Sequence, residues 1–78
     1  MDADKLFKAL GYELTIKEEV NGMRYIYEKG TLDPKRIILS TYNNIKYIYA
    51  DENGYDSVPI TLEEWKAINK KCEELGWI

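Results

Sequence analysis

Residues 60–77 read ITLEEWKAINKKCEELGW, and this stretch predicts a capped amphipathic helix. Thr61 is a favoured N-cap residue, because its hydroxyl can accept a hydrogen bond from the backbone N–H three residues later. Glu64 stands at that third position and can reach back to the N–H of Thr61, which completes a capping box. Gly76 supplies the left-handed residue that ends the helix. The spacing of the apolar residues predicts one buried stripe, formed by Leu62, Trp65, Ile68, Cys72 and Leu75.

A second, shorter helix is predicted near the start of the chain. Asp2 is a favoured N-cap residue, and Gly11 stops the helix after Leu10. From Tyr12 the apolar period changes from 3.6 residues to two, since Tyr12, Leu14 and Ile16 alternate with polar residues. The chain therefore passes from a helix into a half-buried strand.

Tight turns divide the middle of the chain into strands. Asn21-Gly22 is a strong two-residue hairpin signal, because both residues tolerate a positive φ. A strand from Met23 to Glu28 follows, and pairing of Val20 with Met23 would place Ile16 opposite Tyr27.

The second predicted hairpin joins strands 35–42 and 45–50 through Asn43-Asn44. Its register places Leu39 opposite Ile48. Residues 55–58 are a candidate fifth strand, which the sequence leaves open.

Strands joined by tight turns form an antiparallel meander, and two amphipathic helices most simply cover one face of it. We therefore predict one small α+β domain over residues 1–78. Its sheet has four or five strands, and its N-terminal and C-terminal helices pack on the same face. The opposite face is left open.

The composition argues against several classes of function. The chain has no histidine, and Cys72 is its only cysteine, so one chain cannot build a structural zinc site or a Cys/His or Ser/His nucleophile pair. We predict no catalytic residues, no metal and no cofactor. An unpaired thiol fits a reducing cytoplasm. No apolar run approaches the length of a membrane span, so we expect a soluble, cytoplasmic, non-enzymatic protein without a membrane partner.

Charge is distributed unevenly along the chain. The formal net charge is -3, but residues 24–49 carry five basic against two acidic side chains. Both flanking segments are acidic. The middle of the chain therefore predicts a mildly basic surface.

Tyrosine is over-represented, with seven among the 78 residues. Six fall in or beside the predicted strands, where one interpretation is that they pack under the helices or flank them. The other is an exposed patch of rigid amphipathic rings that anchors a partner. Three tyrosines share a face in the predicted register, and four basic residues come from the same strands. The candidate partner-binding residues are Tyr42, Tyr47, Tyr49, Arg24, Lys35, Arg36 and Lys46.

Two stretches carry a resemblance to known proteins. Residues 6–13, LFKALGYE, and the helix that runs from Ala67-Ile68 to Glu74-Leu75-Gly76-Trp77 resemble small uncharacterised proteins encoded by phages and prophages of Gram-positive bacteria. That family has no established activity. The resemblance implies an accessory protein that acts by binding a host or phage protein.

Three functional hypotheses follow. The first is an interaction module that binds a protein partner through the tyrosine-rich sheet face. The second is single-stranded nucleic-acid binding by the same aromatic and basic face, against which the acidic overall charge argues. The third is self-association, in which a second copy covers the open face and makes a sheet-to-sheet dimer.

Overall fold

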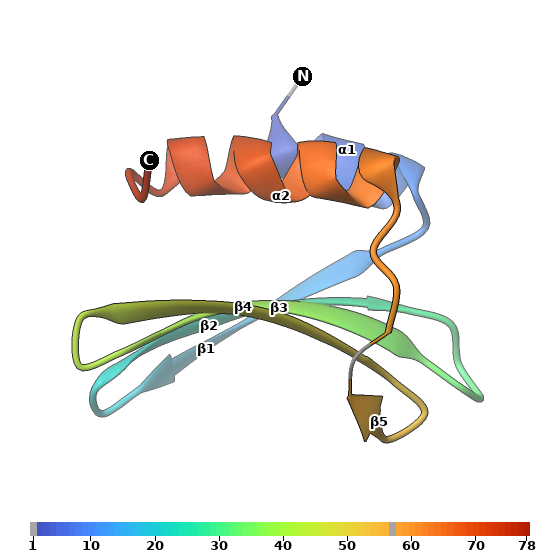
Figure 1. The fold of residues 1–78 in the computed structure, drawn as a ribbon, viewed down its shortest axis with the longest axis horizontal. Coiled ribbons are helices and arrows are strands. Elements are labelled where there is room, and N and C mark those ends of the chain that lie inside the picture. The colour runs from blue at the N-terminus through green and yellow to red at the C-terminus, as the bar shows by residue number, and fades with distance from the viewer. Residues whose placement is uncertain (1, 57) are drawn as a thin grey trace.

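A computed structural model describes residues 2–56 and 58–78 and has the predicted α+β architecture. Two helices lie side by side on one face of a five-stranded antiparallel sheet with the strand order β1-β2-β3-β4-β5 (Figure 1). The candidate fifth strand forms over Tyr55–Asp56; of its predicted continuation, Ser57 lies outside the described residues and Val58 is not in a strand. The elements are α1 (Ala3–Ala9), β1 (Glu13–Glu19), β2 (Gly22–Lys29), β3 (Lys35–Tyr42), β4 (Ile45–Glu52), β5 (Tyr55–Asp56) and α2 (Leu62–Glu74).

Both helices begin and end at the predicted signals. The Asp2 side chain accepts from the N–H of Lys5 at 2.8 Å. The capping box of α2 is complete, with both the Thr61 and the Glu64 side chains bonded. Gly76 has a φ of 75°, and the following N–H, that of Trp77, donates back to the Cys72 carbonyl at 2.8 Å. Local capping chemistry therefore sets the bounds of these helices.

The buried face of α2 differs from the predicted stripe. Leu62 and Trp65 are 70% and 47% exposed, so the part of the prediction that buried them is wrong. The helix packs beside α1 as well as over the sheet, and this second contact rotates its buried arc toward α1. The residues of α2 that are buried are Glu64, Ala67, Ile68, Lys71 and Cys72.

The hairpin between β3 and β4 forms as predicted. Asn43 and Asn44 have φ angles of 50° and 68°, which is the pattern of a type I′ turn. Leu39 lies opposite Ile48, which confirms the predicted register. Asn53-Gly54 makes a similar turn between β4 and β5, with φ angles of 49° and 79°.

The first hairpin turns one residue earlier than predicted, so each residue of β1 pairs with a residue of β2 two positions earlier than predicted. Glu19 pairs with Gly22, so Val20 and Asn21 form the turn, and Ile16 lies opposite Tyr25 instead of Tyr27. Gly22 was predicted to supply a positive φ in the turn, but it is not among the glycines with a positive φ. A Cβ atom at this position would lie 1.8 Å from the carbonyl oxygen of Thr41. Gly22 is therefore required for close approach of two backbones.

The core lies between the helices and the sheet face that they cover. The Phe7 ring of α1 stacks on Tyr27 of β2 with ring centroids 3.7 Å apart, and it meets Tyr12 edge-on at 5.7 Å. Ile37 and Leu39 of β3 are fully buried below α2. Tyr12 and Tyr27 therefore follow the interpretation in which tyrosines pack under the helices.

A buried carboxylate, Glu64, connects three parts of the fold. It accepts hydrogen bonds from the Tyr12 hydroxyl, from Lys35 Nζ at 2.9 Å and from the Thr61 N–H at 2.8 Å. Burial alone raises the pKa of Glu64, but the bonds from Lys35, Tyr12 and Thr61 outweigh it and lower the pKa to about 2. The chain after α1, strand β3 and the start of α2 are thus joined at one charged group.

Asp4 of α1 connects this helix to the sheet and to α2. It accepts from the Tyr27 hydroxyl at 2.7 Å and from Lys71 Nζ at 3.2 Å. Lys71 also lies 5.1 Å from the centre of the Tyr25 ring. Each helix therefore supplies one carboxylate, and each carboxylate binds one tyrosine and one lysine from other elements.

Because the pKa of Glu64 is lower in the folded chain than its usual value of 4.5, its contribution is present above about pH 4.5 and is lost as pH falls toward 2. We expect this group to contribute about 3 kcal/mol to the free energy of unfolding at neutral pH. Glu64→Gln should flatten the fall in stability between pH 5 and pH 2.5, as measured by urea unfolding. The matched exposed variant Glu63→Gln should keep the wild-type slope. Equal slopes for wild type and Glu64→Gln would contradict this role.

Candidate functional site

The sheet face turned away from the helices is the candidate site, here called the open face. Strand alternation and the observed pairing decide which side chains it carries. Toward β5 the strands bend away from the helices, as Figure 1 shows. The residues of β1 to β4 that lie on this face are Glu13, Thr15, Lys17, Glu19, Arg24, Ile26, Glu28, Arg36, Ile38, Ser40, Tyr42, Ile45, Tyr47, Tyr49 and Asp51.

The structure brings five of the seven predicted site residues to the open face. Tyr42, Tyr47 and Tyr49 are 55%, 45% and 39% exposed. Arg24 and Arg36 lie on the same face, on the neighbouring strands β2 and β3. Tyr12 and Tyr27 are thus packed under the helices, whereas Tyr42, Tyr47 and Tyr49 lie on the open face.

Lys35 and Lys46 do not join this group. Lys35 is on the helix side of β3, where its ammonium group binds Glu64 and the Pro59 carbonyl. Lys46 lies opposite Thr41 and shares the helix side with Ile48. The two lysines belong to the same strands as the tyrosines, which is why the sequence suggested them as site residues. Side chains alternate between the two faces along a strand, and this alternation directs both lysines to the other face.

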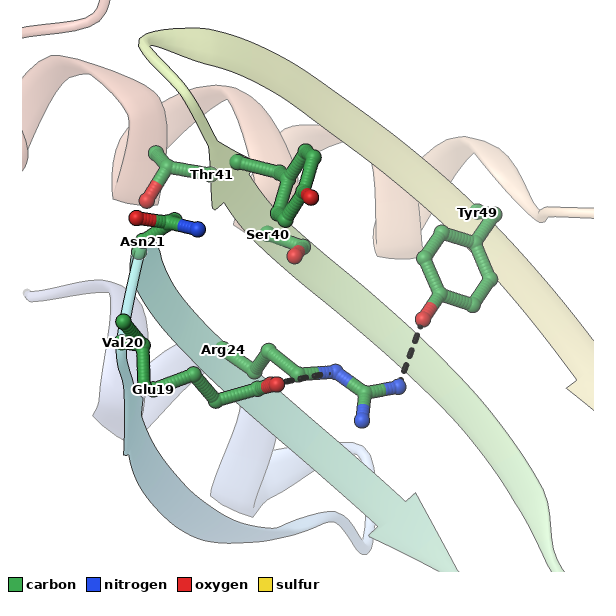
Figure 2. A pocket seen from close by; sticks show the side chains of 9 residues that line it. Glu19, Val20, Asn21, Arg24, Ser40, Thr41 and Tyr49 are labelled. Atoms are coloured by element: carbon green, nitrogen blue, oxygen red, sulfur yellow. Dashed lines mark hydrogen bonds and ion pairs between the residues drawn. The ribbon is translucent and has the colours of Figure 1, made fainter.

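The centre of the open face is buried although no helix covers it. Ile26 and Ile38 lie opposite each other on β2 and β3 and are 7% and 0% exposed. Arg24 Nη2 donates to the Tyr49 hydroxyl at 2.8 Å, so a side chain from β2 meets one from β4 across β3. Figure 2 shows this contact. These long side chains cover the two isoleucines and are themselves held in place.

A hollow of about 290 Å³ opens beside this contact. It lies between the β1–β2 turn and the end of β3 (Figure 2). The N–H of Asn43 donates to the Asn21 carbonyl at 3.0 Å, which ties the two turns at its rim together. The sequence analysis missed this hollow, for which the only signal was the glycine at the turn. Its lining residues are Glu19, Val20, Asn21, Gly22, Arg24, Ser40, Thr41, Tyr42 and Tyr49.

The arginines of the open face are paired with acids. Arg24 Nε lies 3.4 Å from Glu19, and Arg36 makes two hydrogen bonds to Asp51 at 2.8 and 2.6 Å. The bonds from Arg36 lower the pKa of the Asp51 carboxyl, despite burial that acts in the opposite direction. The face carries three basic side chains against four acidic ones, so it has no positive excess.

The described residues give no thiol on the surface and no cluster of metal ligands. Cys72 lies on the buried side of α2, and burial raises the pKa of its thiol. Among residues 2–56 and 58–78, no three His, Cys, Asp or Glu side chains are placed to hold a metal ion. Within the same residues, neither helix has both the length and the apolar composition needed to cross a membrane.

Comparisons with protein-family models, with curated proteins and with solved structures find no match to this chain. The contacts, exposure and charge of the open face are therefore the features that bear on function.

We expect Cys72 to behave as a buried side chain of the core. Its reaction with a thiol reagent at mildly alkaline pH should be roughly 100-fold slower or more in the native protein than in concentrated guanidinium chloride, because attack requires both the thiolate and an opened core. A disulfide-exchange dye measures both rates. A native rate within a few-fold of the denatured rate would show that the thiol is accessible.

Proposed function

We propose that this protein is a small non-enzymatic interaction module, and that it binds a protein partner through the open face. The observation that carries the proposal is the group of three exposed tyrosine rings, Tyr42, Tyr47 and Tyr49, on a sheet face without a covering element. Tyrosine has few rotatable bonds and a large apolar surface, so its rings form contacts at a low cost in conformational entropy. Such residues are common anchors of protein interfaces.

The surroundings of the rings support the binding of a protein surface. Tyr49 is oriented by Arg24 before any partner arrives, which reduces the ordering that binding requires. The hollow beside them presents Ser40, Thr41 and Arg24 as polar groups next to the Tyr42 ring. A partner that inserts one side chain into this hollow would combine apolar contact with hydrogen bonding.

The charge of the open face favours a protein partner over a nucleic acid. Phosphate backbones are bound mainly by an excess of basic side chains. Here Arg24 and Arg36 each face an acid, while Lys35 and Lys46 lie on the other side of the sheet. The aromatic rings alone remain available for stacking, so single-stranded nucleic acid becomes an outcome that the experiment must separate.

The resemblance to phage and prophage proteins directs the search for the partner to the cytoplasmic extract of a Gram-positive host. Tagged protein should retain a specific host or phage protein after nuclease treatment. A purified complex should then be measured by calorimetry. The variant Tyr42→Ser/Tyr47→Ser/Tyr49→Ser should weaken binding about 100-fold or more, because each ring removed from the centre of an interface costs about 1–2 kcal/mol.

Two further variants make this measurement decisive. Leu62→Ser/Trp65→Ser removes exposed apolar side chains from α2 and should leave the affinity unchanged. Tyr47→Ser alone should weaken binding even if the triple variant folds poorly, because Tyr49 then keeps its bond to Arg24. If nuclease treatment abolishes the retention, the open face binds a nucleic acid instead of a protein. Unchanged affinity of Tyr47→Ser and of a folded triple variant would contradict the site.

A further inference from the structure

The two edges of the sheet differ in chemistry. Strand β1 carries a charge at four of its seven residues, Glu13, Lys17, Glu18 and Glu19. Charged side chains prevent an edge strand from pairing with another chain. At the opposite edge, β5 pairs only with Asp51 and Glu52. Among the described residues, none pairs with positions 45–50 of β4, IKYIYA, on this side, and the segment carries one charge, that of Lys46.

Backbone groups along this edge point away from β3, and no strand of the described residues pairs with them between positions 45 and 50. Tyr42 and Ile45 flank the two-residue turn, so they exchange both backbone hydrogen bonds, and the bonding alternates from there along the strand. Lys46, Ile48 and Ala50 therefore direct their N–H and C=O groups away from β3. The pairing of Glu52 with Tyr55 across the next two-residue turn continues the same alternation.

We propose that a second copy of this chain pairs with residues 45–50 of β4, so that two sheets join edge to edge around a twofold axis. The segment is rich in aromatic and β-branched residues, as pairing strands are. Pairing of β4 with β4 uses the same edge of both copies, and the charged β1 edges remain outside. The assembly therefore closes as a dimer instead of growing into a fibre.

Lys46, Ile48 and Ala50 can pair with the same residues of a second copy in three antiparallel registers that are centred near the middle of the segment. A register centred on Lys46 places this residue against Lys46 of the second copy, and like charges directly opposite are destabilising. A register centred on Ile48 places Ile45 of the second copy opposite Asp51, where Asp56 already lies. The register centred on Tyr47 separates the two lysines, and its strand pairing ends with Ile45 opposite Tyr49, so only the Asn43-Asn44 turn of the second copy lies beside Ala50 and Asp51.

In that register Lys46 lies opposite Ile48 of the second copy, and each such pair exchanges two backbone hydrogen bonds. On the open face, Tyr47 meets Tyr47, and Ile45 meets Tyr49. These are the aromatic and aliphatic cross-strand pairs that stabilise sheets. A groove of about 520 Å³ beside Tyr49 and Ala50, bounded by Val58 and Ile60, lies where the Asn43-Asn44 turn of the second copy would arrive.

The register can be tested with opposite charges at one position. Ile48→Lys would place a lysine opposite Lys46 of the second copy, whereas Ile48→Glu would place a glutamate there. Both variants lose the same apolar side chain, so only the sign of the charge differs. We expect the dissociation constant of the Ile48→Lys dimer, measured by sedimentation equilibrium at low salt, to be about tenfold or more above that of Ile48→Glu. Circular dichroism checks the fold of both.

A second pair of variants tests the edge itself. Lys46→Pro removes an outward N–H without breaking a bond to β3, so it should abolish the dimer, whereas Lys46→Ala should retain it. The wild-type mass should rise from one chain toward two as concentration increases to about 1 mM. A monomer throughout this range would overturn the proposal, and so would equal dissociation constants for the two Ile48 variants. A dimer that only Tyr42→Ser dissociates would be a face-to-face dimer and would overturn it as well.

Failure of this pairing would leave the protein-binding proposal intact, because none of the Ile48 or Lys46 variants changes a tyrosine of the open face. Conversely, an edge dimer that binds no partner protein would support the pairing and count against the open-face site.

Discussion

The buried carboxylate of Glu64 is the group on which the arrangement of this protein depends. It is 5% exposed and receives donors from three separate parts of the chain. A charged group that is removed from water must be compensated by hydrogen bonds and an opposite charge, and Lys35 and Tyr12 provide both. Lys35 belongs to β3, and strand alternation directs its side chain to one face of the sheet. It can therefore bind Glu64 only when α2 packs on that face. The same contacts that stabilise the helix layer therefore determine which sheet face is covered.

The uncovered face has to protect its own apolar centre. Ile26 and Ile38 lie where a helix would normally pack, and the side chains of Arg24 and Tyr49 meet above β3 instead. Tyr49 therefore stabilises the sheet and presents a ring to a partner at the same time. Such a surface is ordered before binding, which is the condition under which a few aromatic residues can provide most of an affinity.

Local signals predicted the elements well, because caps and tight turns depend on residues close in sequence. Thr61, Glu64 and Gly76 set the bounds of α2, and Asn43-Asn44 set the register of β3 with β4. Alternation from that register also separates Tyr42, Tyr47 and Tyr49 from the core. These features required no knowledge of how distant elements meet.

The features that the sequence did not reveal depend on contacts between distant elements. The rotation of α2 follows from its packing against α1, which exposes Leu62 and Trp65. The function of Gly22 follows from the approach of Thr41, and both residues line the hollow. The positions of Lys35 and Lys46 do not depend on such contacts. The predicted register of β3 with β4 is sufficient to place both lysines on the helix side. The same alternation that groups the tyrosines places these two lysines on the opposite face.

The claim on which the functional proposals depend is that the helices cover one sheet face and leave the tyrosines of the other face accessible. Tyrosine nitration followed by mass spectrometry tests it most directly, at a dilution where sedimentation shows a monomer. Tyr42 and Tyr47 of the open face should react early, together with Tyr55 of β5, which is 72% exposed, while Tyr12 and Tyr27 should remain protected until the protein unfolds. Rapid modification of Tyr12 or Tyr27 in the folded protein, with Tyr42 and Tyr47 protected, would show that the helices cover the opposite face.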